Sequence, residues 1–118
     1  MSRRLRRASA CLTVVIFSAC STPTFTTEVV MSEFAYEPVT IALSANEPGY
    51  VLTLTNDGST PHDFNFDGLP EDVQVHLAVL PGGEAPYPLP GLPAGEYPFY
   101  CAIEGHREAG MEGVLEVS

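Results

Sequence analysis

Basic residues are scarce in this chain of 118 residues, which contains five Arg and no Lys against 15 Asp and Glu. Four of the five Arg residues lie among the first seven positions, so Arg107 is the only basic residue in the rest of the chain. Beyond residue 19, one Arg against 15 acidic residues gives a formal charge of −14. Such a surface repels nucleic acid and anionic lipid, which argues against both as partners. The charge favours a basic docking partner or a high-salt habitat, and acidity that serves solubility alone explains it equally well.

The N-terminal apolar stretch is too short to cross a bilayer, because a membrane-spanning helix needs about 20 apolar residues. This stretch covers residues 8–19 and follows a head that contains the four early Arg residues. A basic head followed by a short apolar run is typical of a secretory signal. We therefore expect a signal peptide over residues 1–19 and an exported protein, located in the periplasm or on the outer side of the cytoplasmic membrane.

The end of the apolar stretch resembles a bacterial lipobox, in which small residues precede a cysteine that is lipidated after cleavage. Ser18 and Ala19 precede Cys20, although Phe17 stands where Leu is usual. The resemblance implies a lipid on Cys20, a membrane-anchored tether over residues 20–27 and a folded domain over residues 28–118. The alternative is an ordinary secretory signal that is cleaved near the same place.

Cysteine is rare in the predicted mature chain. Cys11 lies in the signal and Cys20 at the lipidation site, which leaves Cys101 as the only thiol of the folded domain. One cysteine cannot form an internal disulfide, and a free thiol outside the cytoplasm is open to oxidation. Metal ligation is the leading explanation for this residue.

The folded domain contains no convincing amphipathic helix and instead shows short strand-like runs separated by Pro, Gly and Asn. We expect strands over residues 26–34, 39–43, 50–55, 62–66, 73–80, 95–101 and 113–117. Residues 69–72 and 81–93 contain six of the eleven prolines and are expected to be mostly loop. About seven strands in some 90 residues predict a single all-β sandwich.

Three metal-binding residue types follow one another near the end of the chain. Four residues separate Cys101 from His106, and four more separate His106 from Met111. Each alone would more often be a core or surface residue, but a thiolate, an imidazole and a thioether on one loop can converge on a single ion. His62 is the candidate fourth ligand. Two His and one Cys with a weak axial Met form a blue-copper site, and we expect the remaining histidine, His76, to be a surface residue.

Three further motifs accompany this ligand set, at residues 33–38 (EFAYEP), 56–58 (NDG) and 92–97 (LPAGEY). On these residues the chain resembles the cupredoxin family over nearly its whole mature domain. The spacing of Cys101 and His106 is similar to that of rusticyanin, auracyanin and sulfocyanin rather than plastocyanin. The resemblance implies a Greek-key β-sandwich of about eight strands, with His62, Cys101, His106 and Met111 holding one copper ion at one end.

The same resemblance implies a one-electron carrier that works as a monomer with a redox partner protein, such as a basic cytochrome, an oxidase or a reductase. One residue departs from the family pattern, since Asp63 follows the first His ligand where Asn is usual. A carboxylate accepts hydrogen bonds but cannot donate them, so we expect part of the usual network between the ligand loops to be rebuilt or missing. Its negative charge should favour Cu(II) and lower the reduction potential.

Copper enzymes of this kind need more ligands than the chain contains. Multicopper oxidases and copper nitrite reductases use His-x-His pairs and a His beside the Cys ligand, whereas Tyr100 and Ala102 flank Cys101 here. The binuclear site of cytochrome oxidase subunit II needs two cysteines in one loop. We therefore expect no enzymatic activity. The alternative that uses the same four ligands is a copper-delivery or copper-buffering lipoprotein.

Overall fold

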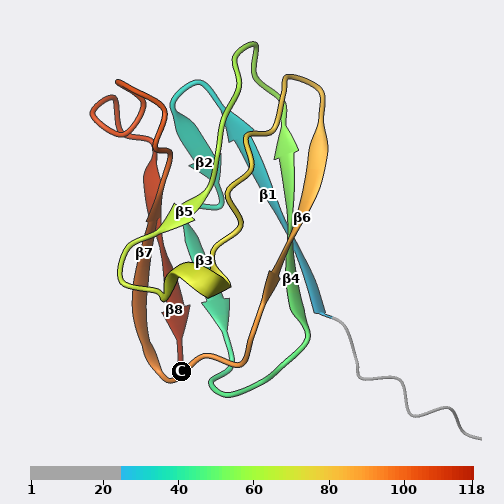
Figure 1. Cartoon of the computed structure of the whole chain (residues 1–118), viewed down its shortest axis with the longest axis vertical. Helices are drawn as coiled ribbons and strands as arrows, with labels where there is room; N and C mark the ends of the chain where they lie inside the picture. Colours follow the sequence, from blue (N-terminus) through green and yellow to red (C-terminus); the bar gives the residue numbers. More distant parts are fainter. Residues whose placement is uncertain (1–24) are drawn as a thin grey trace, which may run out of the picture.

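The computed structural model describes residues 25–118. The expected signal peptide and Cys20 lie outside the described residues. The described chain forms two four-stranded sheets that face each other (Figure 1), which confirms the predicted all-β, Greek-key sandwich. The elements are β1 (Phe25–Ser32), β2 (Ala35–Glu37), β3 (Thr40–Leu43), β4 (Tyr50–Asn56), β5 (Asn65–Phe66), a 3₁₀ helix η1 (Glu71–Val73), β6 (Glu84–Leu89), β7 (Gly95–Tyr100) and β8 (Glu112–Val117).

Each sheet contains one parallel pair of strands. The first sheet has the order β2-β1-β4-β6, with β1 parallel to β4, and the second has the order β3-β8-β7-β5, with β3 parallel to β8. Parallel neighbours cannot be joined by a tight hairpin, so the chain crosses between the sheets. Loops 57–61, 80–83 and 101–111 gather at one end of the sandwich (Figure 1), which we call the upper end. β1 starts at the opposite end, with Phe25 beside Tyr50, and runs toward the upper end.

Aromatic side chains fill the core between the two sheets. The rings of Phe64 and Phe99 stack with their centroids 4.6 Å apart, and Tyr36 packs edge-on against both of them. Phe66 and Tyr87 extend the cluster. All five rings are almost fully buried. Because large aromatic rings bury 150–250 Å² each, this cluster is a major source of stability.

The predicted strand over residues 73–80 is wrong. This segment begins in η1 and then runs as irregular chain, and its only ladder contact is an isolated bridge between Val79 and His62. Val79 is buried, but Leu77 is 47% exposed although both fall on the apolar side of the alternating pattern. An alternating segment becomes a strand only where its backbone pairs with a neighbouring segment, and in residues 73–80 only Val79 has such a partner.

Within residues 25–118, no helix is long and apolar enough to cross a membrane.

β6 lies in a stretch that the sequence predicted to be loop. Its Ala85, Tyr87 and Leu89 are buried against the core, whereas Pro86 and Pro88 are exposed. Prolines at every second position lose their N–H groups on the same side of the strand. Since β6 is an edge strand that pairs only with β4, that side needs no ladder partner.

The folded domain begins earlier than expected. Residues 25–27, which lie in the expected tether and partly in the strand expected over residues 26–34, belong to β1 and pair with residues 50–52 of β4. The amide of Phe25 also donates to the carbonyl of Gly49 at 3.0 Å, and its ring packs on Tyr50. Composition could not reveal this pairing, because the partner strand lies about 25 residues away along the chain.

Candidate metal centre

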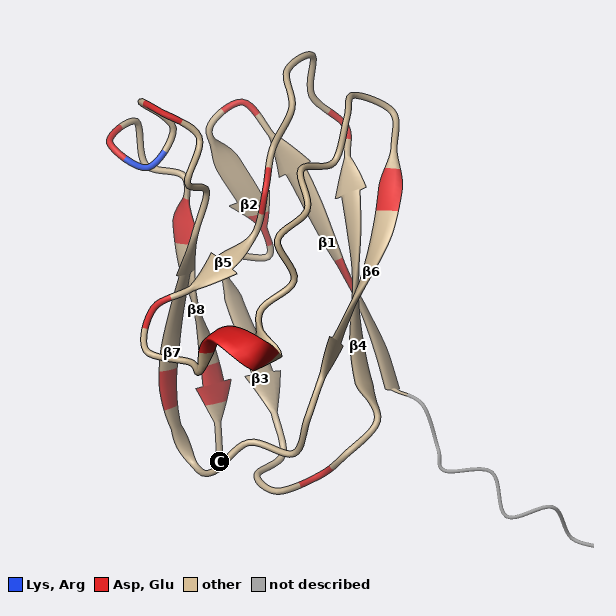
Figure 2. Ribbon diagram, in the orientation of Figure 1, with Lys and Arg blue, Asp and Glu red and all other residues tan. Residues whose placement is uncertain are grey.

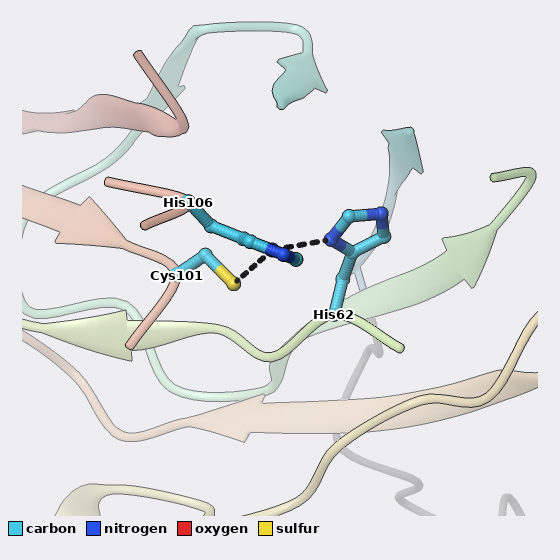
Figure 3. Close-up of side chains that lie close together, drawn as sticks. All are labelled: His62, Cys101 and His106. Carbon is cyan, nitrogen blue, oxygen red and sulfur yellow. Dashed lines mark hydrogen bonds between the residues drawn. The ribbon is translucent and has the colours of Figure 1, made fainter. Parts of the chain in front are cut away.

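Three of the four predicted ligands, His62, Cys101 and His106, lie close together (Figure 3). Cys101 and His106 belong to the loop 101–111 at the upper end of the sandwich (Figure 1). Nδ1 of His62 lies 3.2 Å from Nδ1 of His106, and Sγ of Cys101 lies 3.5 Å from the same nitrogen. The three ligand atoms are all within 4.8 Å of one another. His62 and Cys101 are fully buried, and His106 is 9% exposed. The sequence therefore identified a cluster that the fold brings together.

Met111 is fully buried and lies next to this cluster along the backbone. Its carbonyl accepts a hydrogen bond from the amide of Cys101 at 3.1 Å, and its amide donates to the carbonyl of His106 at 3.0 Å. Met111 is therefore tied by its backbone to both loop ligands. Coordination through its sulfur stays a prediction.

Residues 101–111, which we call the ligand loop, are shaped by short-range backbone hydrogen bonds. The amide of His106 donates to the carbonyl of Ile103 at 3.0 Å, and the amide of Gly110 donates to the backbone carbonyl of Arg107 at 2.9 Å. Gly105 and Gly110 have φ angles of 83° and 107°. Glycine adopts this left-handed region without steric cost, so two tight reversals bring the His106 ring back toward Cys101.

His62 is held by a different kind of support, in residues 56–62, which we call the His62 segment. His62 and Val79 exchange backbone hydrogen bonds of 3.2 and 2.7 Å. The buried side chain of Asn56 donates to the carbonyls of Thr60 and Val79 at 2.8 and 2.7 Å and accepts from the amide of Gly58 at 2.9 Å. The NDG motif indicated a turn here, but it did not reveal that Asn56 secures this segment from inside the fold.

Asp63 connects the two ligand-bearing segments. Its Oδ1 accepts hydrogen bonds from the amide of Ala102 at 2.7 Å and from the side chain of Asn65 at 2.9 Å. The network between the ligand loops, which we expected to be rebuilt or missing, is therefore present, and the Asp63 carboxylate takes part in it only as an acceptor. The Tyr36 hydroxyl donates to the Asp63 carbonyl at 2.6 Å. Burial, with smaller effects from Cys101 and Asp63, raises the pKa of Tyr36, so the hydroxyl remains a donor.

The electrostatics of the cluster follow from its burial. Burial is the main cause that lowers the pKa of His62, and the neighbouring His106 lowers it further. Burial also raises the pKa of the Cys101 thiol. His62 is therefore favoured in the neutral form that binds metals, while the thiol needs a metal ion to lose its proton readily. Two imidazole nitrogens and one sulfur that converge in a buried site fit one copper ion, because imidazole suits Cu(II) and sulfur suits Cu(I).

The turn between β1 and β2 contacts both histidines, and sequence reasoning gave this turn no part in the site. Oε1 of Glu33 lies 3.5 Å from Nε2 of His62, and the ring of Phe34 packs edge-on against His106 with centroids 4.9 Å apart. Phe34 is 42% exposed and has a φ of 33°. The imidazole edge of His106 is therefore largely covered. The EFAYEP motif contains both residues, but their contacts depend on the fold.

Arg107 is engaged with neighbouring side chains. Its guanidinium contacts the carboxylates of Asp67 at 2.7 Å and Glu112 at 3.2 Å, and its carbon lies 4.0 Å from the ring centre of Tyr100. The hydrogen bond to Asp67 is the largest cause that raises the pKa of Arg107. Figure 2 shows acidic residues distributed over strands and loops, with one basic position in the ligand loop. His76 is an exposed residue whose Nε2 lies 2.5 Å from Glu71, as expected for the surface.

Comparisons with known proteins agree with this architecture. A family model described as a cupredoxin-like domain matches residues 7–115. The structure of reduced auracyanin from Roseiflexus castenholzii aligns with a TM-score of 0.70 and 20% identity, over 85% of this chain and 99% of that chain. Oxidized plastocyanin from Dryopteris crassirhizoma aligns with a TM-score of 0.58 and 26% identity, over 78% and 100% of the two chains. A multicopper oxidase aligns with a TM-score of 0.65 and 18% identity, over 83% of this chain and 46% of that chain.

Proposed function

Because the chain belongs to the cupredoxin-like family, we propose that it carries single electrons on a mononuclear type-1 copper centre. The observation that carries this proposal is the convergence of the His62 Nδ1, His106 Nδ1 and Cys101 Sγ atoms in one buried cluster. Catalysis is not part of the proposal, since the chain contains three histidines and no His-x-His pair for a second copper site.

In this proposal each ligand has a distinct role. His62 and His106 would hold copper through Nδ1, Cys101 through its thiolate sulfur, and Met111 as a weaker ligand through its thioether sulfur. A bound copper ion would supply the redox chemistry by alternating between Cu(II) and Cu(I). The protein holds the three strong ligands on segments fixed by hydrogen bonds, and it buries them away from water. Such a preorganised site limits the rearrangement that accompanies each electron transfer.

The test is to load the protein with one equivalent of Cu(II) and measure its visible spectrum and reversible reduction. An intense blue thiolate-to-copper band and one electron per protein are the expected results. Copper-delivery or copper-buffering remains the rival function. The two separate in a competition experiment with a Cu(I) chelator: a carrier keeps its copper through many redox cycles, whereas a delivery protein releases it on the same timescale.

We further propose that the protein is exported and anchored through a lipid on Cys20. The basic head, the short apolar stretch and the lipobox-like end support this location. Cys20→Ala should release the protein from membranes and leave its blue band unchanged. If mass spectrometry finds no acyl chain on the wild-type protein, the anchor is contradicted and an ordinary secretory signal is favoured.

The proposed partner is a basic redox protein that docks at the upper end of a monomer. Because Phe34 covers His106, a partner at this end would meet the Phe34 ring before the imidazole. Electrostatic attraction raises association rates by about 10- to 1,000-fold at low ionic strength, and salt removes that gain. Stopped-flow electron transfer should therefore slow with salt for a basic cytochrome and accelerate for an acidic one. Rates that do not vary with salt would show that the acidity serves solubility.

A further inference from the structure

His62 has one ring nitrogen that the metal-binding cluster does not use. Its Nδ1 faces His106, while its Nε2 is buried and has no hydrogen-bond partner among residues 25–118. The nearest carboxylate is that of Glu33, whose Oε1 lies 3.5 Å away. A fully buried, unpartnered nitrogen beside a carboxylate calls for a physical explanation.

Glu33 is fixed in place by the turn that leads to His62. Its Oε1 accepts hydrogen bonds from the amides of Ser59 at 2.6 Å and Thr60 at 2.9 Å, and from the Thr60 hydroxyl at 3.1 Å. The two amides are the largest causes that lower the pKa of Glu33 to about 2. Gly58 permits this approach, because a Cβ atom at that position would lie 2.5 Å from Oε1.

The chemistry of a neutral imidazole links these two observations. A ring that binds a metal through Nδ1 must carry its proton on Nε2, and the partner of that N–H fixes the tautomer and the ring orientation. Nδ1 of His62 lies 3.2 Å from Nδ1 of His106, and the Cys101 sulfur contacts that same His106 nitrogen, so both partners lie on the Nδ1 side of His62 (Figure 3). The proton therefore belongs on the side that faces Glu33.

We propose that Glu33 is a positioning residue for the copper site, which accepts the Nε2–H of His62 and holds its Nδ1 free for the metal. The inference rests on the proposed function, because it assigns a role toward the same copper ion. We expect the 3.5 Å separation of Nε2 and Oε1 to shorten to an ordinary hydrogen bond when a bound metal fixes the ring. The carboxylate also places a negative charge behind the ligand, which stabilises Cu(II) relative to Cu(I).

The first experiment observes the proton directly. In ¹⁵N-labelled wild-type protein loaded with Cu(I), which is diamagnetic, the Nε2–H of His62 should give a resolved NMR signal that exchanges slowly with solvent. In Glu33→Ala this signal should be lost to fast exchange. Gly58→Ala, which displaces the carboxylate without removing it, should weaken the signal in the same direction. A wild-type ring protonated on Nδ1, or an Nε2–H that exchanges rapidly, would overturn the proposal even if Glu33→Ala fails to fold.

The second experiment measures the charge effect through the reduction potential. Glu33→Gln keeps an oxygen acceptor for Ser59 and Thr60 but removes the charge, and Glu84→Gln makes the same change at an exposed position on β6. Outer partners of metal ligands typically change metal affinity by 10- to 100-fold, so we expect Glu33→Gln to lower the ratio of Cu(II) to Cu(I) affinity about tenfold. This corresponds to a rise of about 59 mV for a one-electron couple.

The outcomes of the second experiment distinguish this inference from the proposed function. If wild type shows no blue band or does not cycle one electron, the proposed function fails. If wild type cycles normally and the potential of Glu33→Gln equals that of Glu84→Gln, only the role of Glu33 is wrong. A potential that rises in Glu33→Gln and returns toward wild type in Glu33→Asp supports the proposal.

Discussion

The ligand loop and the His62 segment deliver their ligands to the same cluster by opposite means. In the ligand loop, Cys101, His106 and Met111 are connected by backbone hydrogen bonds that close within eleven residues. The His62 segment depends on distant partners, since Val79 bridges to His62 and to the buried amide of Asn56. Asp63 then joins the two segments by accepting a hydrogen bond from Ala102.

Because the two segments are held differently, substitutions in them should have different effects. A loop that closes on itself keeps its three ligands in order even when the surrounding sandwich changes. His62 depends also on long-range contacts with Val79, so its position should change when contacts at the upper end are lost. Substitutions in the ligand loop should therefore change the properties of the metal site, and substitutions that support His62 should change stability together with metal affinity.

The largest expected effect is the loss of the thiolate. Cys101→Ser should abolish the blue band completely, because a hydroxyl does not ionise near neutral pH and cannot supply sulfur-to-copper charge transfer. The two side chains are nearly equal in size, so the metal-free protein should keep its fold. Visible absorption after Cu(II) addition and circular dichroism of the metal-free form are the measurements. A blue band that survives the substitution would contradict the copper–thiolate site.

The next effect tests the long-range support of His62. Asn56→Asp removes the two hydrogen bonds that the side chain donates to the carbonyls of Thr60 and Val79 and places a buried carboxylate against these oxygens. The Val79 carbonyl keeps only its hydrogen bond from the His62 amide. Each lost partner of a buried polar group costs about 1–3 kcal/mol. We expect the free energy of unfolding of the metal-free protein to fall by about 3 kcal/mol, measured by urea denaturation. The reciprocal change at the exposed neighbour, Asp57→Asn, should stay within about 0.5 kcal/mol of wild type. Equal stability of the two variants would show that Asn56 does not secure the segment.

Met111 tests whether the ligand loop supplies an axial ligand as well as core packing. Met111→Leu should raise the reduction potential and Met111→Gln should lower it, because the axial ligand shifts the balance between Cu(I) and Cu(II). Each change should reach about tenfold in that balance, which is about 59 mV for one electron. Protein-film voltammetry gives the potentials directly. Two variants with the wild-type potential would identify Met111 as a core residue only.

The smallest effect concerns the residue that joins the two segments. Asp63→Asn keeps an oxygen that accepts from Ala102 and Asn65 but removes the negative charge, so the fold should be retained. We expect the balance of Cu(II) over Cu(I) to fall about threefold, a rise of roughly 30 mV in potential. Asp63→Ala is the comparison, because it also removes the acceptor and should lower stability. A lower potential in Asp63→Asn would contradict the charge argument.

The sequence predicted the cluster better than it predicted its surroundings. The spacing of Cys101, His106 and Met111 by itself indicates a metal-binding loop, and His62 follows a recognisable NDG turn. Glu33 and Phe34 could not be placed in the same way. Their contacts with His62 and His106 cross from one strand connection to another, and no local pattern records such contacts.

The strands show the same limit. The strands expected over residues 50–55 and 95–101 are confirmed as β4 and β7, and each of them pairs with a strand on both sides. Residues 73–80 alternate as well, yet they have no neighbour except at Val79. β6 was missed because Pro86 and Pro88 suggested a loop, although an edge strand accepts prolines on its open side. Whether a segment becomes a strand was decided by its position in the sheet.

The direction of β1 has a consequence for how the protein would stand on a surface. The strand enters at Phe25, at the end opposite the metal cluster, and its eight residues run about 26 Å toward the cluster at 3.3 Å per residue. If Cys20 carries a lipid as proposed, the five peptide steps from Cys20 to Phe25 can span at most about 18 Å, at up to about 3.6 Å per residue. The far end of the sandwich would then rest near the bilayer, and the redox end would face outward. An anchored copy could therefore meet soluble partners from the aqueous side without turning over.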